Sequence, residues 1–245
     1  MTSPFDTSGG DCRLSNVKVN SCSLCDVRSS SICRDLSLSE LAQVDAVMAR
    51  RVVPKGRAIM SEGEPNDHLF VLVRGSMRLT KYLEDGRRQV TGFLFKGDFI
   101  GVRTTKSSAY TAEALDDCHV CRFPHRFLDE AAKTSPDLKD RLIARSQTEY
   151  HKAQDHIVLL GKKTAEERVL SFLDLLEGAV GGQRADGDRE IPLAMPRQDI
   201  ADYLGLRLET LSRTFSLLRK KGLLKEVSRN SVTRSDEASA RLPSI

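Results

Sequence analysis

The sequence has no apolar run approaching the roughly 18 residues of a membrane span. Its N-terminus, MTSPFDTSGGD, lacks the basic and then apolar pattern of a secretory signal, so we expect a cytoplasmic protein. Also missing are paired carboxylates, a nucleophile beside a base and a phosphate-binding loop, and we therefore predict no enzyme activity. The chain of 245 residues is 40% hydrophobic and 29% charged, which suffices for more than one domain.

Charge and cysteine content narrow the functional classes further. A net charge of +4 and a pI near 8.7 are a weak indication of nucleic-acid binding. Three of the six cysteines lie in the short stretch CSLCDVRSSSIC. In a mid-sized protein of a reducing compartment, such thiols indicate metal binding or redox chemistry rather than structural disulfides.

The patterns along the chain divide it into four segments. Residues 1–35 form a flexible N-terminal segment that holds the close cysteines, and residues 36–135 form a sensor domain. A dimerisation helix is predicted for 136–163, and a winged helix-turn-helix for 164–245.

The sensor segment is predicted to begin with a short amphipathic helix and to continue as sheet. LSLSELAQVDAVMARRVV places Leu41, Val44 and Val47 at helical spacing, with Ser37 or Ser39 able to cap the first turn. The residues that follow consist of short apolar runs separated by turns, which favours a compact antiparallel sheet or barrel. The predicted turns lie at Gly75, Asp85-Gly86 and Gly97-Asp98.

A seven-residue repeat marks the long helix predicted for 136–162. One heptad position holds Ile143, Tyr150 and Ile157, and the other holds Ser146, Ala153 and Leu160. Such a stripe suits a two-stranded coiled coil, so we predict a homodimer whose interface includes Ile143, Tyr150, Ala153, Ile157 and Leu160. The alternative is a helix that packs only on its own domain.

The C-terminal segment has the pattern of a winged helix-turn-helix. A capping box of Thr164 and Glu167 begins one amphipathic helix. MPRQDIADYLGLRLETLSRTFSLLRKKGLL then predicts two helices joined by a turn at Gly205, and a small wing is predicted after them.

The second of these helices carries side chains suited to reading base pairs. Glu209, Ser212 and Arg213 lie at i, i+3 and i+4, so they share one helix face. Arg can donate to guanine, Glu can accept from cytosine, and Ser can bond either way or touch a thymine methyl group. An apolar back of Leu208, Leu211 and Phe215 is predicted behind them, and phosphate-facing charge from Arg219, Lys220, Lys221, Lys225 and Arg229. The alternative is a solvated face with an internal Glu–Arg ion pair.

With these residues in place, the chain resembles the FNR/CRP superfamily of transcription regulators, and within it the oxygen-sensing FNR branch. The most specific motif is RQDIADYLGLRLETLSRTFSLLRKKGLL, supported by LLGKKTAEERVLSFL. The resemblance implies an α+β fold with an N-terminal cyclic-nucleotide-binding-like β-roll, a dimerisation helix and a C-terminal winged helix-turn-helix. It also implies double-stranded DNA with TTGAT-like half-sites, in which Arg213 meets guanine, Glu209 the opposing cytosine and Ser212 a thymine.

The resemblance also bears on the sensor's ligand. Family members that bind cyclic nucleotides have a Gly-Glu pair and an Arg-Ser pair in the β-roll, whereas here Val102 follows Gly101 and no Arg-Ser precedes the next strand. We therefore expect no cyclic nucleotide. A haem sensor is a poor second, because the five histidines are scattered without a defined partner.

Cysteine chemistry leaves three hypotheses open on the residues alone. Cys22, Cys25 and Cys33, spaced C-x2-C-x7-C, could hold a [4Fe-4S] cluster with one remote thiolate, form part of a zinc site, or act as a thiol–disulfide switch. The resemblance favours the cluster and implies Cys121 as the fourth ligand. Cys118 is the alternative, although strand alternation would point it to the opposite face, where a small apolar role is expected. The gap before Cys33 is longer than in the best-known members.

The resemblance further implies a mechanism and a partner. A cluster would tie the N-terminal segment to the β-roll under low oxygen and favour the DNA-binding dimer, and RNA polymerase would be contacted by the loop EDGRRQ. Two departures stand out. In well-studied FNR regulators an acidic residue of the dimer interface repels its copy and keeps the cluster-free protein monomeric. The matching residue here is Ala153, so we predict a leakier oxygen switch. Arg87 and Arg88 replace acidic residues in the polymerase-contacting loop.

Overall fold

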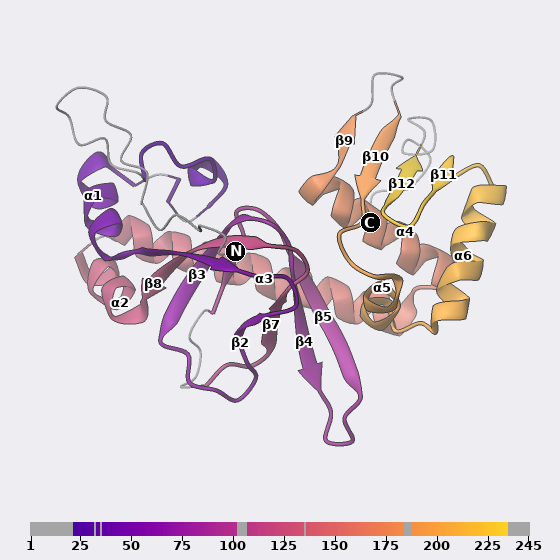
Figure 1. Cartoon of the computed structure of the whole chain (residues 1–245), viewed down its shortest axis with the longest axis horizontal. Coiled ribbons are helices and arrows are strands. Elements are labelled where there is room, and N and C mark those ends of the chain that lie inside the picture. The colour runs from indigo at the N-terminus through magenta and orange to yellow at the C-terminus, as the bar shows by residue number, and fades with distance from the viewer. Residues whose placement is uncertain are drawn as a thin grey trace, which may run out of the picture.

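The computed structural model of the chain describes residues 22–31, 33–34, 36–101, 107–134, 136–183 and 188–234. A β-rich unit and a smaller mixed unit lie at the two ends of a long helix (Figure 1). The long helix is α3, Pro136–Lys162, and it follows the shorter α2, His125–Thr134. None of the helices in this described part is long and apolar enough to cross a membrane.

The β-rich unit consists of two four-stranded sheets, which confirms the predicted sensor fold. One sheet has the order β1-β8-β3-β6 and the other β2-β7-β4-β5. The turns at Gly75, Gly86 and Gly97 all have positive φ, as turn glycines require. The strands are β1 Ala49–Val53, β2 Ala58–Met60, β3 His68–Arg74, β4 Met77–Tyr82, β5 Arg88–Leu94, β6 Phe99–Ile100, β7 Thr111–Ala114 and β8 Cys118–Pro124.

The first helix, α1 (Leu38–Val47), is shorter than predicted. Ser37 caps it in a reciprocal capping box with Glu40, as one of the two predicted caps. The prediction that the helix continues through ARRVV was wrong, because Ala49–Val53 forms β1 and pairs antiparallel with β8. The β-branched Val52 and Val53 suit that sheet position, and Pro54 follows them directly.

Two separate cores lie on the two faces of the β1-β8-β3-β6 sheet. Side chains from both sheets fill the space between them, including Phe70, Leu72 and Cys118. The outer face is covered by the N-terminal segment and α1 through Val27, Leu41 and Val44, which pack on β3 and β8. A short 3-10 helix, η1 at Arg28–Ser30, lies in that covering segment. The strand β8 therefore presents its alternate residues to two different environments.

The C-terminal unit is a winged helix-turn-helix, as predicted. Helix α4 (Ala165–Val180) begins at the Thr164/Glu167 capping box, and α5 (Arg197–Leu204) and α6 (Leu208–Lys220) follow. A four-stranded sheet of order β11-β12-β10-β9 flanks the helices. Of its strands, β11 Glu226–Val227 and β12 Ser231–Arg234 are the predicted wing, whereas no strand was predicted at β9 Gly182–Gln183 or β10 Arg189–Pro192.

Candidate nucleic-acid interface and cysteine site

The helix α6 is held in place by a tight turn and a continuous core. Gly205 ends α5 with φ of 60°, a left-handed conformation that glycine adopts without the strain of a side chain. Leu211, Phe215 and Leu218 are buried against α4 and α5. The outward face of α6 is thereby fixed relative to the rest of the unit.

The predicted base-reading side chains occupy that outward face. Glu209, Ser212 and Arg213 are all exposed. The alternative of an internal ion pair is not supported, because no hydrogen bond or ion pair joins the Glu209 and Arg213 side chains in the described part of the chain. Leu208 was wrongly predicted to be part of the apolar back, since it is 37% exposed and Thr214 is buried instead.

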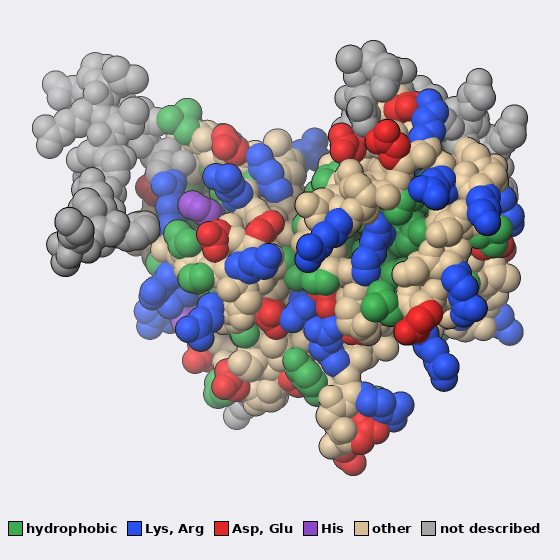
Figure 2. Space-filling view, turned by 45° about the vertical axis from the view of Figure 1, so that its right-hand side comes forward, with side chains coloured by type: hydrophobic (Ala, Val, Ile, Leu, Met, Phe, Trp, Pro, Cys, Tyr) green, Lys and Arg blue, Asp and Glu red, His purple; other side chains and the backbone are tan. Residues whose placement is uncertain are grey.

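The predicted phosphate-facing cations fall into two groups. Arg219, Lys220 and Arg229 are exposed, and Figure 2 shows Lys and Arg side chains over the C-terminal unit. Lys221 is paired with Glu166, and Lys225 with Asp188 at 2.6 Å. These two lysines are therefore partly neutralised within the unit.

An arginine that the sequence did not single out braces this surface. Arg197, at the start of α5, lies 4.2 Å from the Phe215 ring centroid and donates to the Ser228 carbonyl at 2.6 Å. It thereby links α5, α6 and the wing. Nothing in the local pattern marks it, because its partners are distant in sequence.

The four predicted cysteine ligands meet on the outer face of the β1-β8-β3-β6 sheet. Cys22 is buried, and Cys25, Cys33 and Cys121 are half-buried in the same apolar cluster. Cys118 lies in the core between the sheets, with its Sγ 3.2 Å from the Ser76 carbonyl. The two cysteines of β8 therefore point to opposite faces, as strand alternation requires. The remaining cysteine, Cys12, lies outside the described residues.

The environment of Cys22 and Cys121 favours the protonated form of both thiols. Burial, followed by a hydrogen bond to Asp45, raises the pKa of Cys22 to about 12. Burial, followed by the nearby Cys25, raises the pKa of Cys121 to about 11. The Cys22 Sγ donates to Asp45 Oδ1 at 3.3 Å. The sequence alone does not single out Asp45, because it is a polar position of α1 with no motif around it.

Four thiols are a donor set that both an iron–sulfur cluster and a Zn²⁺ ion accept. The thiols are free, which leaves them available as ligands. Within the described residues, no three His, Cys, Asp or Glu side chains are arranged to hold one metal ion.

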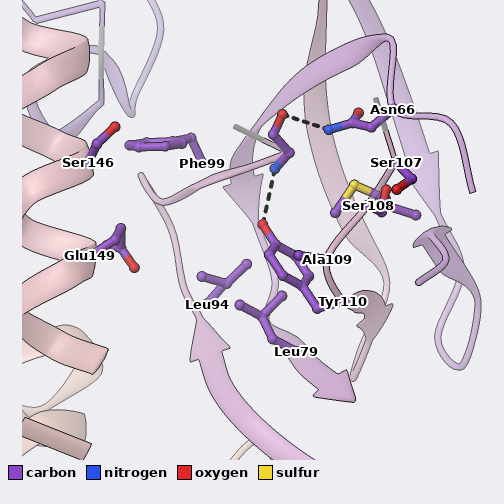
Figure 3. Close-up of a pocket in the computed structure, with 12 residues that line it drawn as sticks. Asn66, Leu79, Leu94, Phe99, Ser107, Ser108, Ala109, Tyr110, Ser146 and Glu149 are labelled. Atoms are coloured by element: carbon purple, nitrogen blue, oxygen red, sulfur yellow. Dashed lines mark hydrogen bonds between the residues drawn. The ribbon is translucent and has the colours of Figure 1, made fainter. Parts of the chain in front are cut away.

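A cavity of about 260 Å³ lies between the β-roll and α3 (Figure 3). Asn66 donates to the Gly101 carbonyl at 2.8 Å, and the Gly101 N–H donates to the Tyr110 hydroxyl at 3.3 Å. Its described lining is largely apolar and contains Glu149 but no Lys or Arg that could hold a phosphate. Val102 lies outside the described residues, so the expected absence of cyclic nucleotide binding stays a prediction.

Helix α3 presents an apolar stripe that the described part of the chain leaves uncovered. Ile143, Tyr150 and Ile157 are 47%, 62% and 71% exposed, and Ala153 is exposed between them. Leu160 differs from the other predicted interface residues, because it packs on the core of its own C-terminal unit.

Comparisons with known proteins cover both units. Residues 50–135 match the cyclic nucleotide-binding domain family, and residues 167–239 match the Crp-like helix-turn-helix domain family. The chain is 36% identical over 203 residues to the nitrogen fixation regulation protein FixK of Bradyrhizobium diazoefficiens, covering 83% of this chain and 85% of that protein. It is 32% identical over 224 residues to the fumarate and nitrate reduction regulatory protein of Escherichia coli, covering 90% and 89%. The structure of FixK2 from Bradyrhizobium japonicum superposes with a TM-score of 0.73 at 35% identity, covering 81% of this chain and 98% of that one.

Proposed function

Because the chain belongs to the FNR/CRP family of DNA-binding transcription regulators, which are not enzymes, we propose that it senses low oxygen through a [4Fe-4S] cluster. The cluster would be held by Cys22, Cys25, Cys33 and Cys121. One observation carries the proposal: these four thiols, from segments far apart in sequence, belong to one apolar cluster on one side of a sheet, and Cys118 lies on the other side.

When bound, the [4Fe-4S] cluster would be the oxygen-sensitive group, because oxygen can destroy it. The residues of the chain connect two parts of the sensor through this cluster. Cys22, Cys25 and Cys33 lie in the segment that precedes α1, whereas Cys121 lies on β8. Thiolate bonds from both would fasten this segment to the sheet. Because burial raises the pKa of Cys22 and Cys121, binding of a cluster by these two thiols must release protons, so loading should be favoured by rising pH.

The proposed active form is a homodimer formed along α3. The exposed stripe of Ile143, Tyr150 and Ile157 supports a second copy at this helix. Two α6 helices can then enter successive major grooves about 34 Å apart, as a palindrome requires. In each half-site we place Arg213 on guanine, Glu209 on the opposing cytosine and Ser212 near a thymine. RNA polymerase is the proposed further partner.

The test is DNA binding with and without oxygen. Anaerobically prepared protein should bind a TTGAT palindrome with a clear preference over random DNA at physiological salt. Exposure to air should weaken that preference without removing it, because Ala153 allows a cluster-free dimer. The absence of preference in both states would refute the regulator, and a preference of unchanged strength in air would refute oxygen sensing. Recovery of air-treated protein by a thiol reductant without iron would instead favour the thiol–disulfide alternative.

A further inference from the structure

A compact ion-pair cluster joins the sensor sheet directly to the helix-turn-helix. Arg78 on β4 and Arg88 on β5 each bind a different oxygen of Asp199 on α5, at 2.6 and 2.7 Å. Arg88 Nε also donates to Asp202 at 3.1 Å. Gln89 adds a hydrogen bond from its amide to the Asp202 carbonyl at 2.6 Å. The strand β5 therefore lies against α5, as Figure 1 also shows.

The cluster is buried, so its charges depend on one another. The Asp199 side chain is only 2% exposed, and the side chains of Arg78 and Arg88 are 16% and 23% exposed. Asp199 lies in the first turn of α5, but no side chain caps that helix, and both of its oxygens accept from the sensor's arginines. Separation of the two units would break both ion pairs of Asp199 and return these charges to water.

An apolar contact continues the same interface. The Phe93 ring of β5 lies 5.5 Å from the Tyr203 ring of α5 and 5.8 Å from the Phe172 ring of α4. His156 on α3 bonds the Tyr203 carbonyl at 2.9 Å. The core of the C-terminal unit thus includes residues of the sensor sheet. This packing resists rotation of the two units about the end of α3.

From these contacts, we infer that β4 and β5 form a docking platform that sets the position of the recognition helix, through Arg88, Gln89 and Asp202. The sensor then acts on DNA by direct contact with α5 as well as through dimerisation along α3. In a dimer, the platform fixes each α6 relative to its own sensor and hence fixes the distance between the two α6 helices. The inference rests on the DNA-binding part of the proposed function and not on the proposed [4Fe-4S] cluster.

The test uses the full-length chain with Arg88→Gln, Asp202→Asn and the two combined. Arg87→Gln is the matched control, because Arg87 is the neighbouring residue and, among the described residues, its side chain pairs only with Asp85 of its own hairpin. Binding is measured on the TTGAT palindrome and on palindromes whose half-site spacing differs by a base pair or more. Sedimentation of each variant records its dimerisation.

Each single variant should bind the normally spaced palindrome at least about fivefold more weakly, and should discriminate less between spacings. The combined variant should lose less than the sum of the two single losses, because both single variants remove the Arg88–Asp202 pair. Dimerisation and the control should not change. Wild-type affinity and spacing preference in Arg88→Gln, or fully additive losses, would overturn the inference.

A second variant covers poor folding. Should Arg88→Gln misfold, the uncharged change Gln89→Ala removes one docking hydrogen bond without leaving a buried charge, and it should relax the spacing preference in the same direction. Unaltered spacing preference in Gln89→Ala would then overturn the inference. The outcomes remain distinct from failure of the proposed function, since that failure appears as no palindrome preference in the wild-type protein.

Discussion

The base-reading role of Arg213 predicts a large and sequence-dependent loss on truncation. Arg213 is exposed and its side chain has no ion-pair partner in the described part of the chain, so Arg213→Ala should change folding stability by less than about 0.5 kcal/mol. A bidentate contact to guanine contributes about 1 to 3 kcal/mol of discrimination. Two half-sites double this to about 2 to 6 kcal/mol, or roughly 30-fold to 20,000-fold in Kd.

Fluorescence anisotropy with two duplexes measures this loss. One duplex carries the TTGAT palindrome, and the other has adenine in place of guanine in both half-sites. Wild type should prefer the first strongly, and Arg213→Ala should bind both alike. Arg219→Ala is the control, because this exposed cation at the far end of α6 should weaken both duplexes equally and reduce the salt dependence. An Arg213→Ala protein that still distinguishes the two duplexes would refute the assignment.

Three further predictions concern α3 and the turn of the helix-turn-helix. Ala153→Asp should restore like-charge repulsion of about 1 kcal/mol across the dimer. In sedimentation of cluster-free protein in air at micromolar concentration, the wild type should be a dimer and the variant a monomer. A wild-type monomer would contradict this prediction. Gly205→Ala should destabilise the chain by about 1 to 2 kcal/mol in thermal unfolding, since φ is +60° and the new Cβ would lie 3.0 Å from Leu160. Unchanged stability would contradict the expected backbone strain at this position. Burial lowers the pKa of His156, so on acidification the unfolded chain binds a proton at this histidine before the folded chain does. The free energy of unfolding should therefore fall as pH drops below about 6.5. Its dependence on pH should be weaker in His156→Gln, and an identical dependence would contradict the role of this histidine.

The elements that the sequence predicts best are those with local signals. Capping boxes at Ser37 and Thr164 determine where two helices begin, and Gly205 determines where α5 ends. The strand β1 was mistaken for helix because its partner, β8, lies far along the chain. Periodicity within a short segment does not indicate pairing with a strand that is distant in sequence.

The candidate sites divide in the same way. Strand alternation alone separates Cys118 from Cys121, and helical spacing alone puts Glu209 and Arg213 on one face. The Asp45 carboxylate beside Cys22 and the docking of Arg88 on α5 could not be predicted, because each depends on how separate elements pack in three dimensions.

The most direct test of the central claim is to count iron and acid-labile sulfide per chain in anaerobically purified protein. The account predicts about four of each for wild type, as a [4Fe-4S] cluster requires, and about four of each for Cys118→Ala, whose thiol lies in the other core. Cys121→Ala should lose most of both. Zinc without sulfide, or a cluster that is lost with Cys118 and retained without Cys121, would contradict the account.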